Sequence, residues 1–329
     1  MRTSQKRVTI FLIDRGAPME LKRYPKNPIL APTKNWWEEY LVFNPAATIF
    51  KDKILLIYRA QGKDRISRFG LAASVDGFNF TRSEVPIFKG DEDNKYERLG
   101  VEDPRITKIG DTFFIVYTSA SVYPANVKKK KFAPSLSSEV PWRVRVSLTT
   151  TLDFKTFTRL GILLPDLDTK DGCLFPEKIN GKFLLIHRIY PNMYLTTSPD
   201  LKNWTNHQVL AITRKGMWDS ERIGADPPPI KTAKGWLLIY HGVDNQKIYR
   251  LGLMILDLNN PNKVLHRSSK PIFEPEERYE KEGYVKNVVF SCGAVQKNSE
   301  LFIYYGGADK VIGLATVSIR EVLNTIKLG

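Results

Sequence analysis

The sequence is poor in the residues that build metal centres and covalent cross-links. It has two cysteines, Cys173 and Cys292, which lie far apart in a chain of 329 residues. Its four histidines show no metal-ligand spacing, so a bound metal is not expected. At most one disulfide can form, and free thiols in a reducing compartment are the default.

The sequence motifs of several common enzyme classes are absent as well. The chain has no P-loop, no Gly-x-Gly-x-x-Gly after a predicted strand and no Gly-x-Ser-x-Gly elbow. The apolar stretch nearest the N-terminus, residues 8–13, is too short for a signal peptide or a membrane span. We therefore expect a cytoplasmic protein that has no membrane partner and no cofactor.

Positive charge is the main excess in the composition. Lysine and arginine outnumber aspartate and glutamate by 50 to 35, which gives a formal net charge of +15. Such a balance suits nucleic acid, an anionic membrane or an anionic substrate. The lysines are scattered apart from the run 128–131, and no motif that reads nucleic acid is present, so a solvated basic surface is the favoured interpretation.

A repeat of short apolar strands organises the chain. Its five copies recur roughly every 60 residues, a spacing typical of propellers and related repeat folds, and they lie at residues 52–58, 111–117, 181–187, 235–240 and 300–305. We expect a partner strand before each copy, opening at residues 44, 102, 175, 225 and 290, and a third strand after it. The turn that follows begins with an aspartate in four units, namely Asp76, Asp153, Asp200 and Asp257.

Five units of about four strands predict an all-β fold, a five-bladed β-propeller. We expect one domain over residues 1–329. Its last blade would be completed by an N-terminal segment, either residues 8–14 or residues 28–30. Residues 318–329 are expected to form a short C-terminal helical tail.

The densest ionisable cluster is the hexapeptide 100–105, GVEDPR, directly before a predicted strand. The first strands of the blades line the central channel, so their entrances should converge. This places Asp103 in a polar pocket as a candidate catalytic acid, with neighbours from the other strand entrances and from the ends of the second strands. These neighbours are Asn44, Glu102, Arg105, Glu177, Lys178 and Asp226, and Arg59, Thr118, Arg188, His241 and Tyr305.

Two reactions fit such a pocket, and the residues alone leave both open. Inverting glycoside hydrolysis needs a carboxylic acid and a second carboxylate that activates water. Phosphorolysis needs an acid and a cluster of cations that binds phosphate. A sugar-binding propeller without catalysis is a third alternative.

Several longer motifs in this order resemble glycoside hydrolase family 130, from about residue 25 to about residue 317. They are FNPAA (43–47), ISRFGLA (66–72), GVEDPR (100–105), LFPEKI (174–179), RIGADPPPI (222–230), GWLLIYHGV (235–243), NVVF (287–290) and YYGGAD (304–309). The resemblance implies a five-bladed propeller that cleaves β-mannosides with inversion. It favours a phosphorylase for β-1,2- or β-1,4-linked manno-oligosaccharides that yields α-D-mannose 1-phosphate.

The resemblance also implies roles for individual residues. Asp103 is the proton donor, acting through a sugar hydroxyl. The implied phosphate-binding set is Arg59, Arg145, Lys178, Arg222, His241 and Tyr305. The implied substrate-binding set is Asn44, Arg65, Arg68, Glu102, Glu177 and Asp226.

One departure from the family keeps the hydrolase alternative open. Asp226 stands where the phosphorylases usually carry glycine, and a β-mannosidase would use Glu221, Asp226 or Glu177 as its base. The sequence leaves the linkage, which we assign to the loop 121–141, and the formation of a homo-oligomer undecided.

Overall fold

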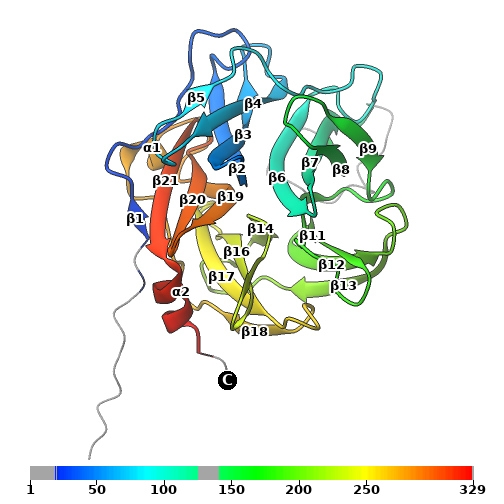
Figure 1. Cartoon of the computed structure of the whole chain (residues 1–329), viewed down its shortest axis with the longest axis vertical. Helices are drawn as coiled ribbons and strands as arrows, with labels where there is room; N and C mark the ends of the chain where they lie inside the picture. The colour runs from blue at the N-terminus through cyan, green and yellow to red at the C-terminus, as the bar shows by residue number, and fades with distance from the viewer. Residues whose placement is uncertain (1–18, 20, 125–140, 328–329) are drawn as a thin grey trace, which may run out of the picture.

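The computed structural model describes residues 19, 21–124 and 141–327, and it confirms the five-bladed propeller (Figure 1). Each blade is an antiparallel sheet, and the blades are arranged around a central axis. Blade 1 contains β2 (Leu41–Phe50), β3 (Lys53–Gln61), β4 (Ser67–Ser74) and β5 (Thr81–Arg82). Blade 2 contains β6 (Val101–Ile109), β7 (Thr112–Val122), β8 (Trp142–Thr151) and β9 (Thr158–Ile162).

The other three blades follow in chain order. Blade 3 contains β10 (Lys170–Leu174), β11 (Phe183–Ile189), β12 (Asn192–Ser198) and β13 (Thr205–Ala211). Blade 4 contains β14 (Arg222–Ala225), β15 (Ile230–Thr232), β16 (Gly235–Val243), β17 (Tyr249–Leu256) and β18 (Val264–Arg267). Blade 5 contains β19 (Val289–Lys297), β20 (Glu300–Gly307) and β21 (Val311–Ser318).

An N-terminal segment completes blade 5, as predicted, but its strand is β1 (Lys22–Arg23), which pairs with Thr316 and Ala315 of β21. Residues 28–30 add only a bridge between Leu30 and Ile312, and residues 8–14 lie outside the described part of the chain. Such pairing covers the backbone groups that an edge strand leaves unpaired.

Two short helices lie beside blade 5. The first, α1 (Arg278–Lys281), holds Glu280, whose carboxylate accepts a 2.9 Å hydrogen bond from Arg23 Nε. The predicted C-terminal helix is present as α2 (Ile319–Thr325), and its Val322 packs into the core beside β21. Neither helix among the described residues is long and apolar enough to cross a membrane.

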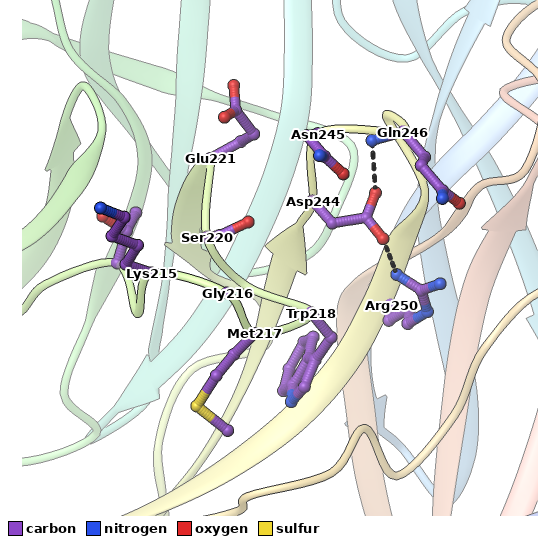
Figure 2. A pocket seen from close by; sticks show the side chains of 11 residues that line it. Lys215, Gly216, Met217, Trp218, Ser220, Glu221, Asp244, Asn245, Gln246 and Arg250 are labelled. Atoms are coloured by element: carbon purple, nitrogen blue, oxygen red, sulfur yellow. Dashed lines mark hydrogen bonds and ion pairs between the residues drawn. The ribbon is translucent and has the colours of Figure 1, made fainter.

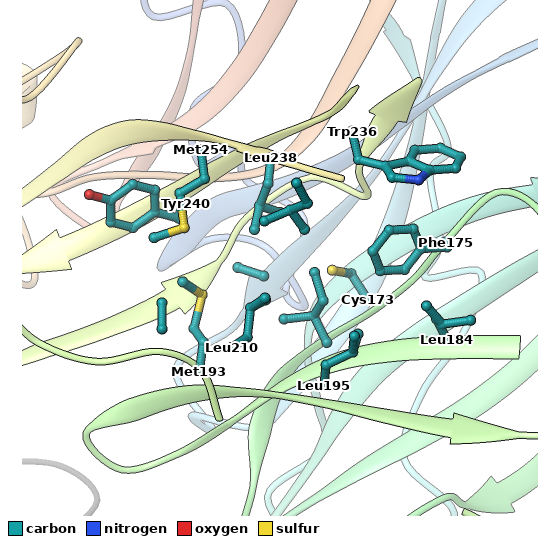
Figure 3. Packing of buried hydrophobic residues seen from close by; sticks show 14 of the residues in the cluster. Cys173, Phe175, Leu184, Met193, Leu195, Leu210, Trp236, Leu238, Tyr240 and Met254 are labelled. Atoms are coloured by element: carbon teal, nitrogen blue, oxygen red, sulfur yellow. The ribbon is translucent and has the colours of Figure 1, made fainter. Parts of the chain in front are cut away.

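The core lies between neighbouring blades. Figure 3 shows the contact between blades 3 and 4, where Phe175 meets Trp236 edge to face with ring centroids 5.3 Å apart. Both side chains are almost fully buried. Burying an aromatic side chain contributes about 1.5–3 kcal/mol to stability. Buried apolar clusters also lie between the other neighbouring blades, which explains the apolar strands of the sequence.

The repeated aspartates set the outer turns. Asp200 Oδ1 accepts hydrogen bonds from the backbone N–H groups of Lys202 and Asn203 at 2.9 and 2.8 Å. Asp76, Asp153 and Asp257 make the same pair of contacts two and three residues ahead. An aspartate that caps its own turn favours this chain reversal.

Two of the predicted strand entrances are wrong. In blade 3 the inner strand β10 ends at Leu174, so residues 175–178 leave the strand instead of entering it. In blade 4 β14 ends at Ala225, so Asp226 also follows its strand. The prolines lie in breaks of the pairing with the second strand, which resumes after them at Ile179 in blade 3 and at Ile230 in blade 4.

Candidate active site

A cavity of about 510 Å³ opens at the centre of the propeller, and we call it the central pocket. All five blades contribute to its wall. Its polar and charged lining residues are Asn44, Arg59, Gln61, Arg65, Glu102, Asp103, Lys170, Asp171, Arg188, His241, Tyr249, Tyr284 and Asp309. Phe43, Leu99, Trp142, Val144, Val285 and Phe290 add an apolar part.

β-Bulges aim three of these side chains into the pocket. The pairing shifts register after Phe43 in β2, after Glu102 in β6 and after Lys170 in β10. The residues at the shifts, Asn44, Asp103 and Asp171, have φ angles of 48°, 49° and 55°. Asparagine and aspartate tolerate this left-handed conformation better than other non-glycine residues. A bulge redirects a side chain, so the local sequence Asx-Pro or Asx-Gly builds the site.

Asp103 lines the central pocket and is 2% exposed. Its Oδ1 accepts hydrogen bonds from Asn44 Nδ2 at 2.8 Å and from Arg59 at 3.2 Å, and its Oδ2 lies 3.4 Å from Lys170 Nζ. Burial alone raises the pKa of Asp103, but the charges of Lys170 and Arg59 and the Asn44 hydrogen bond outweigh it and lower this pKa overall. The carboxylate is therefore ionised at neutral pH.

Two further carboxyl groups face the same space. Glu102 accepts a 2.6 Å hydrogen bond from Arg59, yet burial raises the pKa of Glu102 above its usual value. Burial, reinforced by the Asp103 charge, raises the pKa of Asp309 to about 6 although Arg59 opposes the shift. The pocket thus holds carboxyl groups of clearly different acidity, as proton-transfer sites do.

A buried ionic network forms the wall on blades 3 and 4. Asp171 Oδ2 lies 3.1 Å from Arg188 and 3.6 Å from His241 Nε2, and its Oδ1 lies 3.5 Å from Arg105. Neither Asp171 oxygen has a hydrogen-bond partner within the described residues, and Arg105 is held by the carbonyls of Ala225 and Asp226. Arg188 is thus the cation of this network that lines the pocket.

His241 is fixed in one tautomer by its two contacts. Arg188 lies 3.2 Å from His241 Nε2, and a guanidinium can only donate, so Nε2 is the acceptor. The hydrogen therefore sits on Nδ1 and is donated to Asp226 Oδ1 at 2.7 Å. Burial, and then the positive charges of Arg188, Arg105 and Arg222, lower the pKa of His241, although Asp171 opposes this. The neutral imidazole therefore orients Arg188.

Of the residues singled out from the sequence, those that line the central pocket are Asn44, Arg59, Arg65, Glu102, Asp103, Arg188 and His241. Asp226, Arg222, Arg145 and Tyr305 are buried behind the wall or away from it. Asp226 bonds His241, and Arg222 donates to the hydroxyl of Tyr249.

Arg145 and Tyr305 are engaged elsewhere. Arg145 donates to Asp168 at 2.6 Å and to the carbonyls of Val144 and Pro165. The Tyr305 hydroxyl donates to Glu280 at 2.7 Å. Their hydrogen-bonding groups therefore face internal partners.

Other predicted residues lie outside the pocket. Arg68 pairs with Asp64 at 2.6 Å, and the exposed Glu177 pairs with Lys231 at 2.7 Å. The exposed Lys178 lies over the Phe183 ring at 4.3 Å. Lys170 is the first residue of β10, and Glu177 and Lys178 come after its last residue, Leu174. They therefore lie beyond the opposite end of this strand from Lys170.

Glu221 lines a different cavity of about 680 Å³, which we call the outer pocket (Figure 2). It is formed by residues 213, 215–218, 220–221, 244–246 and 250. None of the bases considered for a hydrolase, namely Glu177, Glu221 and Asp226, lines the central pocket.

Sequence reasoning missed Lys170 and Asp171, and did not single out Asp309. Lys170-Asp171-Gly172 aligns with Glu102-Asp103-Pro104 once the two bulges are compared, and a glycine stands where blade 2 has the proline. Asp309 stands at the end of the YYGGAD motif in the turn after β20. Among the described residues no cluster of histidine, cysteine, aspartate and glutamate is arranged to hold a metal ion.

Comparison with known proteins gives concordant matches. A sequence model of glycoside hydrolase family 130, described as beta-1,4-mannooligosaccharide phosphorylase, matches residues 20–328. The chain is 41% identical over 313 residues to the 1,2-beta-oligomannan phosphorylase of Thermoanaerobacter sp. (strain X514), covering 92% of this chain and 99% of that protein. It is 40% identical over 316 residues to a beta-1,2-mannobiose phosphorylase of the same strain, covering 92% and 98%.

A solved structure matches over a similar length. The beta-1,2-mannobiose phosphorylase from Listeria innocua, in complex with beta-1,2-mannobiose, superposes with a TM-score of 0.81 at 30% sequence identity. The match covers 93% of this chain and 99% of that one.

Proposed function

This chain belongs to glycoside hydrolase family 130, and we propose that its central pocket cleaves β-1,2-linked manno-oligosaccharides with inorganic phosphate, with inversion, to release α-D-mannose 1-phosphate. The choice of β-1,2 linkages follows the two relatives that are about 40% identical and are named for that linkage. Phosphate acts as co-substrate.

One observation carries the proposal: a buried carboxyl group lies close to cations that hydrolysis does not require. Asp103 is the proton donor. Lys170 lies 3.4 Å from it on blade 3, and Arg188 lines the same wall one strand further out. Together they suit a phosphate dianion, which lysine binds as a point charge and arginine by two parallel hydrogen bonds.

The remaining lining residues suit the sugar. Asn44, Arg65 and Asp309 come from blades 1 and 5, on the other side of Asp103 from Lys170. The Arg65 guanidinium is held over the Tyr40 ring at 3.8 Å, which fixes its direction. We assign these three groups to hydroxyls of the mannosyl unit that is cleaved.

The reaction balances without a general base. A phosphate oxygen attacks the anomeric carbon from the face opposite the leaving oxygen, so one C–O bond forms as the glycosidic C–O bond breaks. The proton of Asp103 reaches the leaving oxygen through a hydroxyl of the sugar, and the products are mannose 1-phosphate and the shortened sugar. Asp103 regains a proton from phosphate monoanion or solvent in the next cycle.

Phosphate binding also accounts for how an ionised Asp103 becomes an acid. The charges of Lys170 and Arg59 lower the pKa of Asp103. A dianion placed against Lys170 and Arg188 offsets this positive charge, and a nearby negative charge raises a carboxyl pKa. Binding of phosphate therefore favours protonation of Asp103. As a result, Asp103 is in its acid form only when the nucleophile is bound.

The hydrolase alternative is supported by one feature, because Asp309 lines the pocket and burial raises its pKa to about 6. A carboxyl group of this acidity suits a general base near neutral pH. The sequence departure at Asp226 does not support it, since this carboxyl group is 0% exposed and hydrogen-bonded to His241.

The test is an assay of β-1,2-mannobiose with and without inorganic phosphate, following both mannose and mannose 1-phosphate. The proposal expects mannose 1-phosphate, in equal amount to mannose, only when phosphate is present. Cleavage at the same rate without phosphate would instead assign a β-mannosidase. β-1,4-Mannobiose in parallel tests the linkage.

A further inference from the structure

The outer pocket lies at the same end of blade 4 as the central pocket. One wall is the segment before β14, residues 213–221, and the other is the turn between β16 and β17, residues 244–248 (Figure 2). Its volume, about 680 Å³, is enough for more than one sugar ring. Nothing in the phosphorolysis of a disaccharide uses it.

The indole of Trp218 lines the outer pocket, and two glycines of the sheet leave room for it. Trp218 lies on Gly242 and Gly252, where an added Cβ would stand 2.5 Å from ring atoms. Its Nε1 donates to the carbonyl of Ser269 at 3.1 Å, and Tyr240 supports it with ring centroids 5.4 Å apart. The ring is partly exposed and lines the cavity, so it offers a rigid aromatic platform.

Both walls are held in place before any ligand arrives. Behind Trp218, the fully buried Asp219 carboxylate accepts hydrogen bonds from Arg214 at 2.7 Å and from Arg267 at 2.5 Å. On the other wall Asp244 accepts from Arg250 at 2.6 Å and from the backbone N–H of Gln246 at 3.0 Å, as Figure 2 shows. Preorganised walls lower the cost of binding.

The two pockets share a wall. Arg222 donates to the Tyr249 hydroxyl, and Tyr249 lines the central pocket. The residues next to this pair in the chain, Glu221 and Arg250, line the outer pocket. Side chains that follow one another in a strand point to opposite faces of the sheet, so the starts of β14 and β17 form the wall between the two pockets.

The chemistry of the lining points to a neutral, hydroxyl-rich ligand. Two basic side chains, Lys215 and Arg250, face two acidic ones, Glu221 and Asp244, so the outer pocket has no excess of either charge. The exposed amide of Gln246 can both donate and accept hydrogen bonds, as sugar hydroxyls do. An aromatic face ringed by such groups suits a sugar better than a nucleotide or another anion.

We infer that the outer pocket binds additional mannosyl units of the oligosaccharide whose terminal unit is cleaved in the central pocket, on the side of the leaving group. This inference rests on the proposed function. It makes the protein an enzyme for oligomers in preference to the disaccharide, because only longer chains span the shared wall.

The experiment compares kcat/KM for β-1,2-linked mannobiose and mannotetraose, with phosphate, in the wild type and in Glu221→Gln and Gln246→Ala. Glu221 is partly exposed and Gln246 is exposed, so both variants should fold normally. The matched control is Gln208→Ala, an exposed glutamine in a smaller groove between the same two blades at their opposite end. We expect the wild type to favour the tetraose by about tenfold. Each outer-pocket variant should lower that ratio at least threefold, and the control should not.

Two outcomes overturn the inference: a wild-type ratio near one, or an equal ratio in the variants, the control and the wild type. A separate titration of the phosphate-free protein with mannotetraose measures binding without turnover. Weaker binding in Gln246→Ala but not in Gln208→Ala supports the subsite even if no phosphorolysis occurs. Failure to cleave mannobiose with phosphate would refute the proposed function instead, so the two failures are distinguishable.

Discussion

Replacing Lys170 by methionine should impair phosphate use and shift the pH dependence together. Methionine keeps most of the side-chain length but removes the ammonium group, whose nitrogen lies 3.4 Å from Asp103 Oδ2. At this distance the attraction is about 1 kcal/mol at the dielectric constant of water and about 5 kcal/mol at an effective value of ~20. Each 1.36 kcal/mol corresponds to about one pKa unit, so the pKa of Asp103 should rise by about one unit or more.

The sign follows from the role of Asp103 as an acid. Its protonated form is the active one, so the alkaline limb of the pH–rate profile reports its pKa. With Lys170 removed, the carboxyl keeps its proton to higher pH, and this limb should move upward by about one pH unit or more. Loss of a charge-assisted hydrogen bond, about 1.5–3 kcal/mol, should also raise the KM for phosphate by about tenfold to 100-fold.

The assay is the initial rate of mannobiose phosphorolysis from pH 4 to 9 at a series of phosphate concentrations. Lys178→Met is the matched control, because Lys178 was assigned to phosphate from the sequence but lies exposed outside the pocket. It should leave both quantities near the wild-type values. If Lys178→Met raises the KM for phosphate and Lys170→Met does not, the placement of phosphate on blade 3 is refuted.

Three further changes test other parts of the account. Asp103→Asn should lower kcat by about 10²–10⁴-fold, whereas Glu102→Gln should lower kcat far less. Equal losses of kcat in steady-state assays of the two variants would contradict the assignment of Asp103 as the proton donor. Burial raises the pKa of Asp309 to about 6, so the folded state holds this proton more tightly than the unfolded chain and stability falls as pH rises from about 4 to about 6. Denaturant unfolding measures the free energy of unfolding at pH 4.5 and at pH 7. The difference between these two values should change by about 1–3 kcal/mol in Asp309→Asn, and an unchanged difference would contradict the assigned pKa. Arg23→Met should lower the melting temperature, since it removes the 2.9 Å contact to the buried Glu280 that ties β1 to blade 5, and an unchanged value would mean that this contact does not hold the ring closed.

The sequence is a good guide to the propeller because its signals are local. The second strand of each blade is a short apolar run. Four outer turns are capped by their own aspartate, as Asp200 illustrates. The closing strand was harder to place because β1 has two residues, Lys22 and Arg23, and carries no apolar pattern. Its position is set by pairing with β21, nearly 300 residues further along the chain.

The sequence pattern located residues of the central pocket where motif and bulge coincide. Asn44 and Asp103 each precede a proline at a bulge, and both line the central pocket. It failed in blade 3, where the bulge is Asp171-Gly172 and the nearby proline belongs to the following turn. Lys178 was therefore chosen over Lys170, which the structure places 3.4 Å from Asp103.

Long-range pairing explains the remaining differences. The side chain of Arg145 is a cation on a strand beside the pocket, but Asp168 and two backbone carbonyls engage it. Tyr305 ends a strand equivalent to those of Arg59 and His241, yet its hydroxyl turns to Glu280 of α1. Neither partner can be identified from spacing, because each comes from a segment without a repeat counterpart.

The central claim is that phosphate, not water, attacks the anomeric carbon. Its most direct measurement is a time course of β-1,2-mannobiose with inorganic phosphate, followed by proton and phosphorus NMR. We expect α-D-mannose 1-phosphate to be the first sugar phosphate formed and to appear in step with mannose as phosphate is consumed. Mannose that accumulates while the phosphate signal stays constant, or a first product with the β configuration, would contradict it.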